Sequence, residues 1–262
     1  MVIFRVLAVV FVLILSIALP MPAGAAEKEE AMKENLFIFT PRIWLGYYVG
    51  PKESEDIQET FMMPMYGGTF TFVPKALPDL NFLATILHGS GNGKLLERDT
   101  NYSGKTESTR TDFEFLVRYN VIGAKFYLLG GLRYVSFDLK ESWEPFPFKS
   151  TTDVKVIGPE LGFGASVYLT QDNKHQIFSN VVVLFGSYTH DYSDTTKFTE
   201  SRSFFAPGID LNIGYQYWVT PTINVSARYR TFAFYYEGKN NNRTYSDLVV
   251  FHGPEFGVSF LF

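Results

Sequence analysis

The last stretch of the chain, residues 253–262, alternates strictly between two kinds of side chain. Every second side chain is bulky and apolar, and those between them, apart from Leu261, are small or charged. A period of two is typical of a β-strand with one apolar and one polar face. The stretch is about as long as the roughly 9–11 residues with which a tilted strand crosses the hydrocarbon core of a bilayer. Such a strand survives in lipid only inside a closed barrel, where its backbone groups are all paired.

A chain that ends on phenylalanine, with another aromatic residue two positions earlier, resembles the C-terminal signature of Gram-negative outer-membrane β-barrel proteins. The resemblance covers residues 253–262 alone and implies the class without a subfamily. It also implies that the outer-membrane insertion machinery reads the final strand as its signal. The residues that match the signature are Phe256, Val258, Phe260 and Phe262.

The rest of the chain repeats the pattern, with apolar alternation in segments separated by polar connections that alternate between long and short. An up-and-down membrane barrel has long loops on one side and short turns on the other. We therefore predict an all-β, transmembrane, antiparallel barrel of about ten strands, with eight or twelve as alternatives and both termini periplasmic. A soluble β-sandwich is the competing fold, but it would not sort its connections by length. The expected strands cover 37–49, 61–73, 80–88, 112–121, 125–139, 157–169, 177–188, 208–218, 223–236 and the C-terminal stretch.

The amino end has the organisation of a secretory signal peptide. Arg5 supplies the positive region, residues 6–19 an apolar core, and Ala23-Gly24-Ala25 a small-residue cleavage site. We expect residues 1–25 to be removed on export, residues 26–35 to form a charged periplasmic lead-in, and residues 36–262 to form a single outer-membrane barrel. The expected location is the outer membrane.

Composition narrows the possible partners. The chain has no cysteine, which excludes disulfides and thiolate metal sites. Its formal net charge of −4 argues against a nucleic-acid partner. No spacing typical of a metal site, phosphate loop or dinucleotide site is present, so we expect no cofactor and no metal. The expected partners are the lipid bilayer, the insertion machinery and small solutes or ions.

Charged residues recur within the expected strands, and a charge on the lipid face would be heavily penalised. We therefore expect these side chains to point inward, where acid and base on neighbouring strands come within pairing distance. Arg133 should lie between Glu114 and Glu160, and Arg228 and Arg230 between Asp210 and Glu255. The expected lumen belt consists of Glu114, Arg118, Arg133, Glu160, Asp210, Arg228, Arg230 and Glu255.

Other strand residues have structural interpretations. Pro159 and Pro254 cannot donate to a β-ladder and are expected at bulges or near the outer rim. Tyrosines and tryptophans near the strand ends are expected in the two aromatic girdles of a membrane barrel. They are Trp44, Tyr47, Tyr48, Tyr119, Tyr127, Tyr134, Tyr215, Tyr217, Trp218, Tyr235 and Tyr236.

Catalysis by a barrel of this size would resemble that of the omptin proteases, which use Asp and His at the extracellular rim. The sequence lacks a paired-aspartate strand and an Asp-x-His strand of that kind. His88, His190 and His252 are expected near the rim, but adjacent residues of a strand face opposite sides, so His190 and Asp191 make a poor dyad. We expect no catalytic residues and no enzyme.

Two roles follow from the expected barrel. We expect a polar lumen spanned by the belt. Small barrels are filled by side chains, so the belt either closes the lumen or forms a narrow constriction for small solutes. The protein is then a narrow channel or a largely closed scaffold that presents extracellular loops, with function residing in those at 89–110, the longest, and 140–153. The alternatives are an adhesin or receptor that works through these loops and a rim hydrolase of the omptin or lipid-deacylase type.

Overall fold

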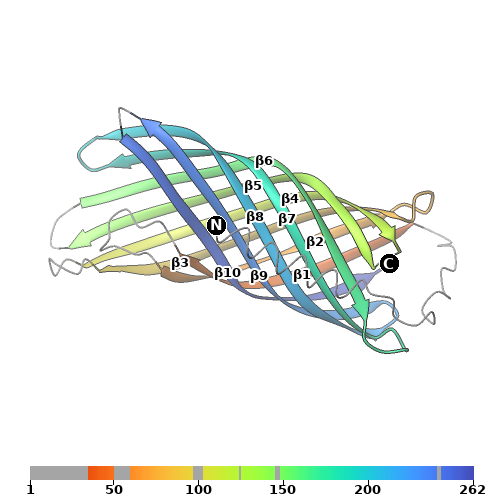
Figure 1. Cartoon of the computed structure of the whole chain (residues 1–262). Coiled ribbons are helices and arrows are strands. Elements are labelled where there is room, and N and C mark those ends of the chain that lie inside the picture. Colours follow the sequence, from red (N-terminus) through yellow and green to blue (C-terminus); the bar gives the residue numbers. More distant parts are fainter. Residues whose placement is uncertain (1–34, 50–59, 97–102, 124, 145–147, 241–242) are drawn as a thin grey trace.

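A computed structural model describes residues 35–49, 60–96, 103–123, 125–144, 148–240 and 243–262. These residues form a closed barrel in which every strand pairs antiparallel with its sequence neighbours and β1 closes the ring with β10 (Figure 1). The strands are β1 (Leu36–Val49), β2 (Thr60–Val73), β3 (Leu80–Leu96), β4 (Ser103–Ile122), β5 (Phe126–Glu144), β6 (Phe148–Tyr168), β7 (His175–Asp194), β8 (Thr199–Thr220), β9 (Ile223–Asn240) and β10 (Arg243–Leu261).

The predicted fold class is confirmed: the barrel is all-β, antiparallel and ten-stranded. The predicted signal peptide (1–25) and nearly all of the lead-in (26–35) lie outside the described residues. No helix in the described part of the chain is long and apolar enough to cross a bilayer. The described chain begins and ends at one end of the barrel, where Phe37 and Phe262 exchange backbone hydrogen bonds. We call this the near end and the opposite one the far end.

The long loops predicted from the sequence are largely strand. Most of 89–110 belongs to β3 and β4, which pair residue by residue from Leu80↔Tyr119 to Leu96↔Ser103. Most of 140–153 belongs to β5 and β6, which stay paired up to Trp143↔Phe148. Polar composition suggested loops there, but hydrogen bonding between backbones continues regardless of side-chain polarity. The barrel wall therefore extends further at the far end than expected.

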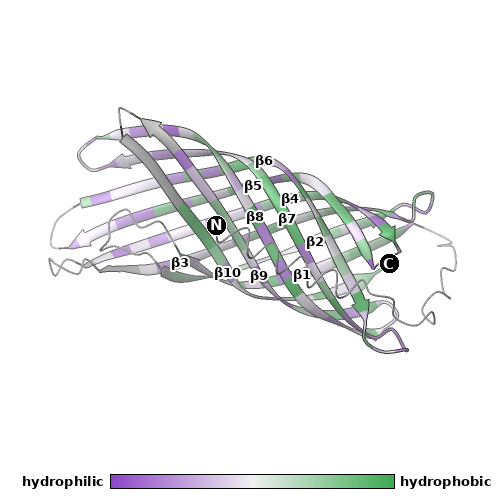
Figure 2. Ribbon diagram, viewed as in Figure 1, coloured by the Kyte–Doolittle hydropathy of each residue, from purple (hydrophilic) through white to green (hydrophobic). Residues whose placement is uncertain are grey.

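The outward surface of this wall changes character along the strands. On β5, Leu132 and Tyr134 are followed toward the far end by Ser136 and Asp138, which point the same way. The neighbouring strands β4, β6, β7 and β8 change from apolar to polar at paired or nearby positions. We call the apolar zone the lipid-facing band and the polar zone the far-end wall. Figure 2 shows hydrophobic residues predominating along the middle of the strands and hydrophilic ones gathering toward their ends.

Pro159 and Pro254 lie neither at bulges nor at the rim, contrary to the prediction. Each follows a glycine and precedes an inward glutamate, within the lipid-facing band. The β6–β7 ladder lacks two pairs at Gly158 and Pro159, and the β1–β10 ladder lacks two at Gly253 and Pro254, without any change of register. Proline has no N–H to donate, so a short gap suffices to accommodate it. A Cβ on Gly253, whose φ is +155°, would lie 2.0 Å from the carbonyl oxygen of Leu45.

Candidate functional site in the barrel interior

The ion pairs predicted around Arg133 are present in the lumen. Its Nε lies 3.1 Å from Oε2 of Glu160, and its Nη1 lies 2.6 Å from Oδ2 of Asp210. Its Nη2 donates to Glu114 on the paired position of β4. One guanidinium from β5 therefore meets three carboxylates, from β4, β6 and β8. All of these side chains lie within the lipid-facing band, since their neighbours along each strand are apolar and point outward.

A second centre of the belt surrounds Glu255 on β10. Oε1 of Glu255 lies 2.7 Å from Nη1 of Arg42 and 2.6 Å from Nη2 of Arg228. Nη1 of Arg230 lies 3.6 Å from Oε2, while its Nη2 donates to Asp210 at 2.6 Å. Asp210 thereby connects this centre to Arg133. Burial of so many charges is tolerable because each carboxylate meets at least one guanidinium.

The structure adds three residues to the belt that the sequence interpretation omitted. Arg42 on β1 pairs with Glu255 on β10, where the two strands close the barrel. The spacing of residues along the sequence cannot predict this pair, because the two residues lie near opposite ends of the chain. Arg110 forms a two-pronged pair with Asp112 at 2.5 and 2.6 Å, and both side chains are buried. Arg110 had been placed in the loop 89–110, although its spacing from Asp112 and Glu114 already puts all three on one face of a strand. We define the belt as Arg42, Arg110, Asp112, Glu114, Arg133, Glu160, Asp210, Arg228, Arg230 and Glu255.

Arg118, predicted as a belt member, points inward but lies on the near-end side of the belt. Its Nε donates to Oδ1 of Asn120 at 2.9 Å, and its guanidinium carbon lies 3.6 Å from the centre of the Tyr127 ring. Within the described residues it makes no salt bridge to a carboxylate. Predicting it as an ion-pair member of the belt was therefore wrong.

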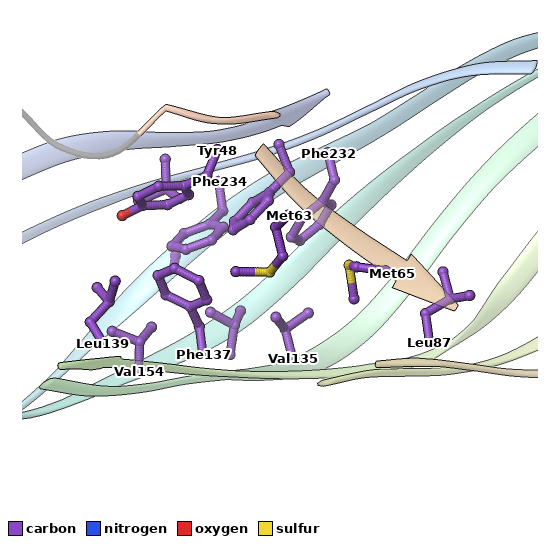
Figure 3. Packing of buried hydrophobic residues seen from close by; sticks show 14 of the residues in the cluster. Tyr48, Met63, Met65, Leu87, Val135, Phe137, Leu139, Val154, Phe232 and Phe234 are labelled. Atoms are coloured by element: carbon purple, nitrogen blue, oxygen red, sulfur yellow. The ribbon is translucent and has the colours of Figure 1, made fainter. Parts of the chain in front are cut away.

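A cluster of buried apolar side chains fills the lumen on the far-end side of the belt, and we call it the apolar plug. Tyr48 contacts three other rings of the plug, with the ring centroids of Phe61, Phe137 and Phe251 4.8–4.9 Å away. Figure 3 shows side chains from several strands converging there. The sequence predicted a polar lumen, and the apolar plug corrects that prediction. It comprises Trp44, Tyr48, Phe61, Met63, Met65, Leu87, Val135, Phe137, Leu139, Val154, Val156, Leu184, Tyr188, Ala206, Phe232, Phe234, Val249 and Phe251.

The plug and the belt are joined by contacts between cations and rings. The guanidinium carbon of Arg110 lies 3.7 Å from the centre of the Phe251 ring and 5.2 Å from that of Trp44. The guanidinium carbon of Arg133 lies 4.8 Å from the ring centre of Phe232. Such contacts attract a cation to the face of the ring, and desolvation strengthens them. The arginines of the belt therefore contact the rings of the plug directly, without a layer of water between them.

The near-end lumen, between the belt and the short turns, has a different lining. Its inward side chains are mostly amides and hydroxyls, about half of them buried and the rest partly exposed, and a small apolar cluster of Leu116, Leu129 and Val182 packs with Tyr127 among them. Hydrogen bonds join several of these side chains: Thr40 donates to Ser259 and Gln176 to Ser166, both at 2.9 Å, while Arg118 donates to Asn120 and Tyr127 to Asn180. Solvent therefore reaches part of this space, at the partly exposed side chains such as Arg118, Asn120 and Gln216. The polar lining comprises Thr40, Arg118, Asn120, Tyr127, Ser166, Gln176, Asn180, Asn212, Gln216, Asn224, Ser226 and Ser259.

The predicted aromatic girdles are only partly right. Tyr47, Tyr119, Tyr134, Tyr215, Tyr217 and Tyr235 point outward, as a girdle requires. The other five aromatic residues alternate with outward residues of their strands and therefore point into the lumen. Some lie in or beside the plug, and the others lie in the near-end lumen. These five are Trp44, Tyr48, Tyr127, Trp218 and Tyr236. Proximity to a strand end could not separate the two groups, whereas parity with the inward charges of the same strand would have done so.

The three histidines expected near the rim do not converge. His88 and His252 face outward on β3 and β10, where they contact Thr111 and Tyr229 at 2.9 and 2.6 Å. His190 faces inward on β7, stacked on Tyr188. Burial, together with the nearby charge of Arg202, lowers the pKa of His190. Asp191 faces the other side of the wall, so the two cannot form a dyad. Among the described residues, no group of three or more His, Asp or Glu side chains is arranged to hold a metal ion.

The far-end wall carries one unusual group of like charges. Asp138, Asp153 and Asp191 stand directly opposite one another on β5, β6 and β7 and point outward. Partial burial raises the pKa of Asp153, and the adjacent charge of Asp138 adds to this effect. Like charges that face each other across strands destabilise a sheet. This group is therefore a source of strain in the far-end wall.

The insertion-signal residues Phe256, Val258, Phe260 and Phe262 face outward at the near end of the wall. Phe37 and Phe70 also point outward near that end, with ring centroids 5.9 Å apart. The C-terminal stretch belongs to β10, the strand that pairs with β1 and closes the barrel. Its reading by an insertion machinery stays a prediction.

Comparison with solved structures shows the fold and no more. The outer-membrane protease OmpT of Escherichia coli aligns with a TM-score of 0.58 and 10% sequence identity, over 92% of this chain and all of that one. The translocator domain of the autotransporter NalP of Neisseria meningitidis aligns with a TM-score of 0.45 and 11% identity, over 88% of this chain and 90% of that one. No protein-family model matches the chain, and no curated protein matches it significantly. The fold is that of the bacterial outer-membrane β-barrels.

Proposed function

We propose that the protein is an integral outer-membrane β-barrel that is closed to solutes and serves as a scaffold for its far-end wall. The lipid-facing band supports membrane residence, because it exposes large apolar side chains such as Ile43, Leu132 and Leu161 around the barrel. The resemblance of the C-terminal stretch supports insertion by the outer-membrane machinery. In this orientation the near end faces the periplasm and the far-end wall faces the outside of the cell.

The observation that carries the proposal is the pairing of belt and plug. Arg133, Glu160, Arg230 and Glu255 are almost fully buried in the middle of the barrel, and the plug lies directly beyond them. Protein interiors are packed with few voids larger than a water molecule. A solute would therefore have to displace both the ion pairs and the packed rings.

The other candidate functions receive less support. A narrow channel would need the plug to move aside. A rim hydrolase would need a carboxylate that orients His190, whereas Asp191 points away and Glu200 is paired with Arg202. The named neighbour OmpT is a protease, but similarity at 10% identity extends to the fold alone. An adhesin remains compatible with a closed barrel, and its binding surface would then lie on the extended β-wall rather than in long loops.

The test is single-channel conductance of the refolded protein in a planar bilayer. Wild type should give no discrete current steps. A variant that removes the centre of the plug (Tyr48→Ala, Phe137→Ala and Phe251→Ala together) should be the more permeable of the two. Regular ion-selective steps in folded wild-type protein would overturn the closed barrel and favour the channel.

A further inference from the structure

Positive charge is unevenly distributed over the belt. Three guanidinium groups, those of Arg42, Arg228 and Arg230, share the single carboxylate of Glu255. Arg230 also uses Asp210, whereas the other two have Glu255 as their only carboxylate partner among the described residues. The β1–β9–β10 side of the belt therefore carries more positive charge than its own carboxylate neutralises.

The two arginines with a single shared partner are also the accessible ones. The Arg42 and Arg228 side chains are 17% and 13% exposed, whereas those of Arg110, Arg133 and Arg230 are at most 3% exposed. Within the described residues, Nε of Arg228 is buried and has no hydrogen-bond partner. Because the plug seals the other side, this exposure is toward the near-end lumen.

A third arginine lines the same space. Arg118 projects inward from β4, stacks on Tyr127 and lacks a carboxylate partner among the described residues. A partly buried guanidinium without a counter-ion destabilises the folded protein, because its lost hydration is not replaced. A bound anion would supply the missing partner and stabilise the barrel.

The rest of the near-end lumen matches such a ligand. Among its described inward residues there is no aspartate or glutamate. Amides and hydroxyls dominate, and they can donate hydrogen bonds without adding negative charge. Some of these side chains, such as Asn120, Gln216 and Ser226, are partly exposed, so water reaches them, and a small solute can enter by the same route.

We propose that the near-end lumen binds a small free oxyanion, a phosphate or a carboxylate, through the partly exposed guanidinium groups that line it, those of Arg118, Arg42 and Arg228. The planar fork of a guanidinium suits two oxygens of such an anion, and a site removed from bulk water strengthens the attraction. The anion enters and leaves on the periplasmic side only, because the belt and plug close the other side. The protein would then be an anion-binding barrel rather than an anion channel.

The experiment is equilibrium dialysis of radiolabelled inorganic phosphate against the refolded full barrel in a non-ionic detergent. Wild type should bind one phosphate saturably, with sulfate and acetate competing and chloride competing far less. Arg118→Gln should weaken binding by about tenfold or more, as expected for loss of a charge-assisted contact. Arg118→Lys, which keeps the charge but loses the fork, should fall between the two.

Lys155→Gln is the matched control, since it removes one positive charge from the outward face of the far-end wall. It should bind phosphate as wild type does. Arg118→Gln removes no partner of a buried carboxylate, so it should fold, and its circular dichroism should show the β-signal of wild type. The proposal is overturned if wild type shows no saturable binding, if Arg118→Gln binds equally well, or if Lys155→Gln loses binding to the same extent.

Discussion

Side chains alternate between the inward and outward faces in both halves of this barrel, but the polarity of the two faces is reversed between the lipid-facing band and the far-end wall. In the lipid-facing band the outward residues are apolar, and the belt turns its charges inward. In the far-end wall the outward residues are polar, and the plug turns rings and aliphatic groups inward. On β5 the reversal occurs within a few residues: Leu132 and Arg133 in one half, Ser136 and Phe137 in the other. One half is built for lipid and the other resembles a soluble β-barrel with a dry core.

The comparison shows why the lumen closes. A strand that leaves the bilayer loses the apolar solvent outside it, so its hydrophobic side chains must pack inside instead. Where the strands extend beyond the lipid-facing band, their apolar side chains therefore pack inside the barrel and form the plug. The belt and plug meet at Arg110, Arg133 and Phe232, where guanidinium groups lie against rings.

The largest effect is expected from the belt. Arg133→Met should destabilise the barrel by about 3–5 kcal/mol, because it leaves three buried carboxylates with too few partners. The measurement is the urea midpoint of unfolding in detergent or lipid vesicles. A second substitution, Glu160→Gln, should recover part of the loss. Equal stability of Arg133→Met and wild type would show that the belt is not a buried ion-pair network.

A substitution in the plug should lower the free energy of unfolding by a similar or slightly smaller amount. Phe137→Ala should lower stability by about 3–4 kcal/mol, as truncation of a buried aromatic ring leaves a void. Ser187→Ala, on the outward face of the far-end wall, should change stability by no more than about 0.5 kcal/mol. If both changes were equally mild, the far half would lack a packed core.

The boundary between the halves is tested by placing one charge on either side of it. Leu132→Arg should cost about 2–4 kcal/mol if its position lies near the middle of the bilayer. Ser136→Arg, four residues along the same outward face, should be nearly neutral. The readout is the free energy of unfolding in vesicles. Reversed or equal costs would move the boundary or remove it.

The smallest effect concerns the aspartates of the far-end wall. Burial raises the pKa of Asp153, so the folded state binds its proton more tightly than the unfolded state. Stability should therefore fall as pH rises from the ordinary aspartate pKa through the raised one. Asp153→Asn should stabilise the protein by up to about 1 kcal/mol at neutral pH, the usual size of a facing like-charge pair.

The gain from Asp153→Asn should disappear once the pH falls below the ordinary aspartate pKa, since the carboxyl is then protonated in both states. Urea midpoints at a series of pH values measure this. A benefit that persists in acid would mean that shape rather than charge is responsible.

Much of this architecture could be predicted from the sequence, because alternation and the exclusion of charge from lipid are local rules. They place the strands and turn Glu114, Arg133 and Glu160 inward. Arg42 escaped them because its partner Glu255 lies at the opposite end of the chain and meets it only when β1 closes the ring with β10.

The plug escaped prediction for another reason. Val135 and Phe137 share the parity of Arg133, so the sequence already placed them inside. The expectation of a polar lumen concealed this, because it treated the whole strand as if lipid surrounded it. Where the outward residues become Ser136 and Asp138, lipid is no longer the outer solvent, and the inner face should be read as a core.

The central claim, a wet near half and a dry far half, is tested most directly by thiol accessibility. The chain has no cysteine, so single substitutions report cleanly. Ser226→Cys in the near-end lumen and Ala206→Cys in the plug should be treated with a membrane-impermeant thiol reagent on folded protein. The account predicts that Ser226→Cys reacts and Ala206→Cys does not until the barrel is unfolded. Comparable reaction of both in the folded state would contradict a closed barrel.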